Sequence, residues 1–140
     1  MITLTASTSG IVPEGTLTLA AKTGVYITDN MKGEATNKAL VINADADSHY
    51  SSTPVPSPNI STGTLTVAST KTVTSNDSDV TITAWDVDMS GSLTAGTKSI
   101  SIHGSYASQT IGVGATSKDM QISDGAVSYT HLTLPTTPYV

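Results

Sequence analysis

The sequence contains no cysteine, no arginine and no phenylalanine, and it has a single tryptophan. Without cysteine no disulfide framework can form, and the thiol content says nothing about the cellular compartment. With six lysines, no arginine and a net charge of −5, the chain lacks the positive charge that phosphate binding requires, so we expect no nucleic-acid partner. Without phenylalanine the core must be built from Val, Ile, Leu, Met and Ala, as a narrow interior requires.

Long hydrophobic runs are also missing. No segment approaches the roughly 18 consecutive apolar residues of a membrane-spanning helix, so we expect no membrane span. The first residues, Met-Ile-Thr-Leu-Thr-Ala-Ser, lack a basic region and a long apolar region, so no secretory signal is visible.

Apolar residues recur every 20 positions between residues 67 and 122. A spacing that holds in several independent columns is the signature of a repeat protein in which each turn stacks on the last. The sequence predicts four such columns, namely Val80–Ile100–Met120, Ile82–Ile102–Ile122, Val73–Leu93–Val113 and the weaker Val67–Val87–Ala107.

Within one period the apolar residues alternate, and the phase of the alternation changes twice. A straight strand points successive side chains to opposite faces and cannot change phase. The chain must therefore turn near residues 84–86 and again near 96–99, with further bends at Gly91 and Gly104. Three short strands per turn, stacked in parallel, predict an all-β fold, a right-handed parallel β-helix of about 20 residues per turn.

The predicted β-helix covers residues 1–126. A phrase of glycine, hydroxyl residue, Leu, Thr and an apolar residue starts at Gly15, Gly63 and Gly91, and the apolar run 39–42 predicts a buried strand. Residues 51–58 contain three prolines and predict a loop between turns, since proline cannot donate to a ladder. Residues 127–140 break the pattern and look like translated sequencing-adapter read-through, which would make this chain a fragment of a longer repeat protein.

Segments 80–89, 91–97, 100–104 and 109–114 carry a resemblance to a known family. Their Val-Thr-Ile-Thr-Ala, Gly-Ser-Leu-Thr-Ala, Ile-Ser-Ile-His-Gly and Gln-Thr-Ile-Gly-Val-Gly motifs are similar to the repeat regions of filamentous-haemagglutinin-like proteins. The resemblance implies a right-handed β-helix in a secreted or cell-surface protein with a structural or adhesive role. Host-surface or extracellular glycans or proteins are the partners it implies, and it leaves the oligomeric state open.

Asp86 and Asp88 are the candidate catalytic pair of an alternative function. On a strand their Cα atoms would lie about 7 Å apart on one face, within the range of paired acids in sugar hydrolysis. Trp85 is the candidate ligand-binding residue, because an aromatic ring can stack on a sugar. No acidic residue lies one period before or after this pair. We therefore expect a solvated face and no enzyme, with a carbohydrate-active lyase or glycosidase as the alternative.

Two acidic groups are candidate calcium sites, since calcium binds clustered oxygens. They are Asp77 and Asp79 with Asp86 and Asp88, and the segment 43–47 (Asn-Ala-Asp-Ala-Asp). Both lack the glycine and terminal acid of known calcium loops. His49, His103 and His131 lie too far apart for metal-ligand spacing, and His103 belongs to an outward column, Thr83–His103–Ser123. We expect no metal and no cofactor.

Two further patterns suggest binding surfaces. The glycines in 109–116 resemble a phosphate loop, but the Lys-Ser/Thr ending is missing and no helix follows, so a strand and a tight corner are expected. Thr-x-Thr pairs at 16/18, 64/66, 72/74 and 81/83 raise an ice-binding or polysaccharide-binding face as another alternative. At a period of 20 residues the pairs do not stack into a regular grid. Threonine is also common in β-strands in general, which explains the pairs without a binding surface.

Overall fold

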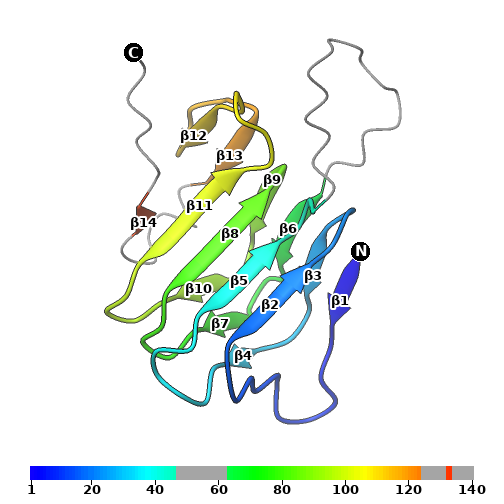
Figure 1. The fold of residues 1–140 in the computed structure, drawn as a ribbon. Coiled ribbons are helices and arrows are strands. Elements are labelled where there is room, and N and C mark those ends of the chain that lie inside the picture. Colours follow the sequence, from blue (N-terminus) through cyan, green and yellow to red (C-terminus); the bar gives the residue numbers. More distant parts are fainter. Residues whose placement is uncertain (47–62, 124–131, 134–140) are drawn as a thin grey trace.

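The computed structural model describes residues 1–46, 63–123 and 132–133. Within these residues the protein is all-β: it has strands, turns and bends, and no helix (Figure 1). The Pro-rich segment 51–58 and all but two residues of the tail 127–140 lie outside the described residues, so the predicted loop and the unusual origin of the tail stay predictions.

Most of the strands belong to three sheets, which we number in the order in which one turn of the chain visits them. Sheet 1 contains β2 (Leu17–Ala20), β5 (Leu40–Asn43), β8 (Val80–Ala84), β11 (Ile100–Gly104) and β14 (Leu132–Thr133). Sheet 2 contains β1 (Ile2–Leu4), β3 (Val25–Ile27), β6 (Thr64–Val67) and β9 (Asp86–Met89). Sheet 3 contains β4 (Met31–Lys32), β7 (Thr72–Thr74) and β10 (Ser92–Thr94).

From β2 to β10 the chain visits sheets 1, 2 and 3 in the same order three times. Within each sheet, strands from successive visits pair with each other, and every pairing among the described residues is parallel. Figure 1 shows β2, β5, β8 and β11 side by side in this sequence. The predicted parallel pairing of three short strands per period is therefore confirmed.

The 20-residue columns are confirmed in the middle of the chain. Val80 pairs with Ile100, Ile82 with Ile102, and Val73 with Leu93. The corners fall where the change of phase predicts them. Trp85 alone separates β8 from β9, and residues 95–99 separate β10 from β11.

The predicted column Val67–Val87–Ala107 is wrong. Val67 pairs with Met89, and Val87 pairs with Leu65, so the register here is 22 residues instead of 20. The reason lies in the corners. Residues 68–71 join β6 to β7 by four residues, whereas residues 90–91 join β9 to β10 by two. The longer corner contains Thr70 at a φ of 65° and closes with a hydrogen bond from Lys71 N to the carbonyl of Ala68 (3.1 Å).

The last member of each column is also wrong. Met120 and Ile122, in β13 (Met120–Ile122), pair with Ile111 and Val113 of β12 (Ile111–Val113), only nine positions earlier. β13 lies beside β9 of sheet 2, so neither Ile122 nor Ser123 continues sheet 1. Ile100 is instead followed in its column by Leu132 of β14.

The departure begins directly after β11. Residues 105–110 form no strand, although sheet 2 is the next sheet in the order, and Ala107 is exposed there. The Gln109 side chain holds this loop, because its Oε1 accepts a hydrogen bond from Ser105 N (2.7 Å) and its Nε2 donates to the carbonyl of Trp85. The chain therefore reaches β12 without completing a further visit to sheet 2.

The core is a continuous cluster of aliphatic side chains on the inward faces of the sheets. Ile82, Ile102 and Ile122 are at most 2% exposed, so all three point inward as predicted although only the first two are strand neighbours. At the N-terminal end the matching side chains are only partly buried, namely Ile2, Leu4, Ile11 and Leu17. The other buried members of the core are Leu19, Ala21, Val25, Ile27, Met31, Leu40, Ile42, Ala44, Leu65, Val67, Val73, Val80, Ala84, Val87, Met89, Leu93, Ala95, Ile100 and Met120.

The repeated glycine-hydroxyl-Leu-Thr phrase marks the start of a strand in three different sheets. Its leucines are Leu17 in sheet 1, Leu65 in sheet 2 and Leu93 in sheet 3. The three leucines therefore do not occupy equivalent positions in successive turns. The extra chain lies between β5 and β8, because Leu40 and Val80 are direct neighbours although they are 40 positions apart in the sequence.

Candidate functional site

Asp86 and Asp88 lie on the outward face of β9, where Val87 and Met89 between and after them are buried. Asp86 Oδ1 accepts a hydrogen bond from Gln121 N (3.3 Å), and Asp88 Oδ1 accepts one from the Ser90 hydroxyl (2.8 Å). The predicted placement of both carboxylates on one face is confirmed. Each carboxylate is engaged by its own neighbour, and the two share no hydrogen-bond partner among the residues that the structure describes.

Trp85 forms the corner between sheets 1 and 2 and packs against Tyr106. Their ring centroids are 5.4 Å apart, with planes inclined by 34°, a geometry typical of aromatic pairs. Burial raises the pKa of the Tyr106 hydroxyl, and the nearby Asp119 carboxylate adds to that rise. The predicted corner tryptophan therefore supports the loop 105–110 with one side of its ring.

Asp77 and Asp79 belong to the corner between sheets 3 and 1, and each caps the next turn of the chain. Asp77 Oδ1 accepts from Thr97 N (2.9 Å), and Asp79 Oδ1 accepts from Ser99 N (3.2 Å) and from the Ser99 hydroxyl (2.9 Å). The Ser99 N–H is the main reason why the pKa of Asp79 lies below its ordinary value. These carboxylates stabilise a corner.

The structure does not gather the four predicted calcium-binding aspartates into one site. Among the residues that the structure describes, no three His, Asp or Glu side chains lie close enough together to hold a metal ion. In the other candidate segment, 43–47, the Asn43 side chain accepts a hydrogen bond from Asp45 N (3.2 Å) and Asp45 is buried, while Asp47 lies outside the described residues.

His103 is exposed on β11 opposite Thr83, as predicted for an outward column. His49 and His131 lie outside the described residues. In segment 109–116, residues 111–113 form a short strand and Gly114 has a φ of 69°, so the predicted strand and corner are confirmed.

The outward threonines do not line up into a grid. In sheet 1, Thr81 lies between Val41 and Ser101, and Thr83 lies between Asn43 and His103. In sheet 2, Thr64 and Thr66 face Asp86 and Asp88, and in sheet 3 Thr74 follows Lys32. The mixture of residue types agrees with the expectation from the sequence that no regular threonine surface forms.

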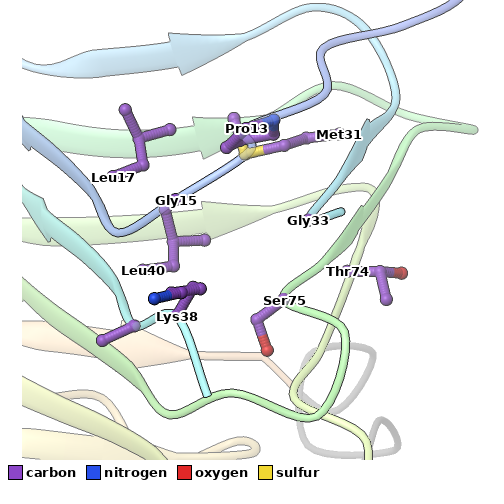
Figure 2. A pocket seen from close by; sticks show the side chains of 10 residues that line it. Pro13, Gly15, Leu17, Met31, Gly33, Lys38, Leu40, Thr74 and Ser75 are labelled. Carbon is purple, nitrogen blue, oxygen red and sulfur yellow. The ribbon is translucent and has the colours of Figure 1, made fainter. Parts of the chain in front are cut away.

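A small pocket opens between sheets 1 and 3 near the N-terminal end (Figure 2). Leu17, Leu40 and Met31 line it with Pro13 and the Lys38 side chain. Its volume is about 10 Å³, which is about the space that one water molecule needs. This pocket is a gap where the core is thin, and it has no room for a substrate.

Two larger hollows lie on the outer surface. One, of about 280 Å³, follows the corners between sheets 2 and 3 and is lined by Thr70, Lys71, Met89, Ser90 and Ser92 among others. The Lys71 ammonium there is already paired with the Asp29 carboxylate (3.2 Å), and this pairing is the main reason why the pKa of Asp29 is lowered.

The second hollow, of about 180 Å³, lies on the outer face of sheet 2 beside Tyr26. Tyr26 is 38% exposed, and the alternation of β3 places it outward between the buried Val25 and Ile27. Sequence reasoning did not single out this residue. The alternation Val-Tyr-Ile was a signal that it points outward, but its neighbours across the sheet could not be known without the register.

No family model, curated protein or solved structure matches this chain. Among the described residues no helix is long and apolar enough to cross a membrane.

Proposed function

We propose that this chain is a segment of a right-handed parallel β-helix and that its role is structural or adhesive, not enzymatic. The repeated order of sheets 1, 2 and 3, with parallel pairing throughout, supports the solenoid. The right hand is the one that parallel crossover connections adopt almost without exception. The resemblance of its repeats to filamentous-haemagglutinin-like proteins supports a place in a secreted or cell-surface protein.

The mechanism of such a segment is mechanical. Each turn contacts only the turns before and after it, so the stack behaves as a nearly one-dimensional rod. Backbone ladders run along the rod in three sheets, and inward aliphatic columns such as Val80–Ile100 and Ile82–Ile102 hold the turns together. The outward residues, with hydroxyls and carboxylates, remain available for contact with a partner.

The position of Asp86 and Asp88 supports a non-enzymatic role. Both carboxylates stand on the outer face of a sheet, and each accepts a local hydrogen bond. Paired acids in glycoside hydrolysis flank the bond to be cleaved and are held on either side of a bound sugar. Two neighbours on the same side of one strand do not have that arrangement.

The one observation that carries the proposal is the threefold recurrence of the three sheets, and force spectroscopy tests it. A solenoid pulled by its ends should release one turn at a time. The registers of 20, 22 and 23 residues predict length increments of about 70–80 Å, and the 40-residue register between β5 and β8 predicts one of about 140 Å. A single release of the whole chain would contradict the proposal.

The variants Ile82→Ala and Thr81→Ala provide a matched pair on β8. Ile82 is fully buried in a column, whereas Thr81 is outward. Removal of the inward side chain should lower the force of the corresponding step, and removal of the outward one should leave it unchanged.

The enzymatic alternative is tested separately by incubation with soluble glucans, xylan and polygalacturonate. We expect no new reducing ends and no unsaturated product. Turnover that Asp86→Ala or Asp88→Ala abolishes would show that the protein is a carbohydrate-active enzyme.

A further inference from the structure

We infer that the outer face of sheet 2 carries a binding site for a neutral glycan, centred on Tyr26. This inference deepens the proposed adhesive role and rests on it. The site consists of the Tyr26 ring, the hollow beside it, and hydroxyl and carboxylate groups on β6 and β9. We call this group of residues, Tyr26, Thr64, Thr66, Asp86 and Asp88, the Tyr26 face.

The strand register places the side chains of the Tyr26 face in two adjacent columns. Tyr26 is opposite Thr66, and Thr66 is opposite Asp88. In the other column Thr64 is opposite Asp86. Neighbouring strands are about 4.8 Å apart, so the Tyr26 column extends over about 10 Å from β3 to β9 and the Thr64 column over about 5 Å from β6 to β9, and the columns are about 7 Å apart. A surface of this size accommodates a short oligosaccharide.

Gly24 forms the floor of the hollow at the end of the second column. A Cβ atom at this position would come within 2.8 Å of the Thr64 carbonyl oxygen, and the residue has a φ of 118°. Only glycine fits here without strain. The absence of a side chain at Gly24 therefore lets this segment approach the backbone of Thr64 closely, and Tyr26 borders an open space of about 180 Å³.

The exposed Tyr26 ring and the threonine hydroxyls near it offer two kinds of contact to a sugar. Burial of a large aromatic side chain is favourable, so a ring left 38% exposed beside a hollow offers a surface on which the C–H face of a sugar can pack. Within the part of the chain that the structure describes, the hydroxyls of Thr64 and Thr66 make no hydrogen bond. They can donate to or accept from sugar hydroxyls.

The charge of the face selects among glycans. Asp86 and Asp88 supply carboxylate oxygens, which accept strong hydrogen bonds from hydroxyl groups. The same two negative charges, on a chain of net charge −5, repel a polyanion, and they outnumber the single positive charge of the Met1 ammonium, which donates to Thr23 at the same hollow. A neutral polysaccharide is therefore the ligand class that fits, and an acidic one such as polygalacturonate does not.

Affinity electrophoresis of the whole chain tests the site. Native gels would contain mixed-linkage glucan, galactomannan or xylan, with polygalacturonate as the acidic comparison. We expect at least one neutral polysaccharide to retard the protein and polygalacturonate to leave its mobility unchanged. Tyr26→Ala should weaken the retardation about tenfold, the scale of a lost aromatic contact, whereas Tyr26→Phe should retain it.

Two further variants keep the result interpretable. Thr66→Val keeps the shape and strand preference of the side chain and removes only the hydroxyl, so it should fold normally and weaken binding about threefold. Thr81→Ala, on the outer face of sheet 1, should bind like the original chain. The inference would be overturned if no neutral polysaccharide retards the protein, or if polygalacturonate retards it more strongly than the neutral polysaccharides do. It would also be overturned if the Tyr26→Ala and Thr66→Val variants are retarded as strongly as the original chain. Stepwise release under force would persist in those cases, so loss of this site alone leaves the structural proposal standing.

Discussion

The 20-residue apolar spacing runs from β8 through β11 to β13, but its structural meaning differs between the region of β8 and β11 and the region of β12 and β13. In the first pair the spacing marks direct neighbours, since Ile82 lies opposite Ile102. In the second region Ile122 lies 20 positions after Ile102 but pairs with Val113 instead. Ile82, Ile102, Met120 and Ile122 are buried, whereas Ile111 and Val113 of β12 are only partly buried. The comparison shows that an apolar period reports which residues face inward, and that the corners decide which strands become neighbours.

The largest expected effect distinguishes inward from outward positions in the regular region. Ile102→Asp places a carboxylate without a partner in the core and should cost at least about 4 kcal/mol in the free energy of unfolding. His103→Asp, one residue later on the exposed face of β11, should change it by less than about 1 kcal/mol. Urea denaturation measures both. Equal losses at the two positions would show that the inward and outward assignment of β11 is wrong.

The variant Gln109→Ala tests what holds the irregular region together. The Gln109 side chain accepts from Ser105 N and from the Ser105 hydroxyl and donates to the Trp85 carbonyl, so Gln109→Ala removes all three of these bonds from the loop after β11. We expect a loss of about 1–3 kcal/mol, because two partly buried backbone groups lose their partner. Ser108→Ala, at an exposed position of the same loop, is the control and should have little effect. If the two variants are equally stable, the Gln109 bonds do not hold the loop.

Thr70 tests the longer corner that shifts the register from 20 to 22 residues. It adopts a φ of 65°, which a β-branched residue tolerates poorly. Thr70→Gly should therefore raise the free energy of unfolding by about 0.5–1 kcal/mol after the greater flexibility of glycine in the unfolded chain is counted. Thr72→Gly, in the strand that follows, should lower it. A thermal melt of both variants decides, and a loss of stability in Thr70→Gly would contradict the geometry of this corner.

The smallest effect concerns pH and compares one carboxylate from each region. Hydrogen bonds from Ser99 lower the pKa of Asp79, and hydrogen bonds from Thr110 lower the pKa of Asp119. Because the folded-state pKa lies below the ordinary 3.8, each ionised group stabilises the fold above that pH. This contribution is lost as the pH falls through 3.8 and on through the folded-state pKa.

Urea midpoints measured between neutral pH and pH 2 should show a shallower acid loss in Asp79→Asn and in Asp119→Asn than in the original chain. An unchanged dependence in both variants would mean that the hydrogen bonds to these carboxylates do not persist in solution. A change in Asp79→Asn alone would show that the regular corner is the more firmly held of the two.

Most of the regular region could be predicted from the sequence because its signals are local. Alternation fixed the inward side chains of β8 and β11, and the change of phase located the corner at Trp85. The register of β6 and β9 could not be predicted, because it depends on whether a corner takes four residues or two, and both lengths are compatible with the same strand pattern. The outward placement of Asp86 and Asp88 was predictable, whereas their hydrogen bonds to Gln121 and Ser90 were not.

By itself the sequence determined that this protein is built from short strands with one aliphatic face and one polar face, because a strand displays its pattern in every second residue. Only the tertiary structure decided that β13 lies beside β9, and that Tyr26 shares a face with Thr66 and Asp88. Neighbours across a ladder are set by the length and hydrogen bonding of every corner between them. That information is spread over the whole turn and is absent from any single strand.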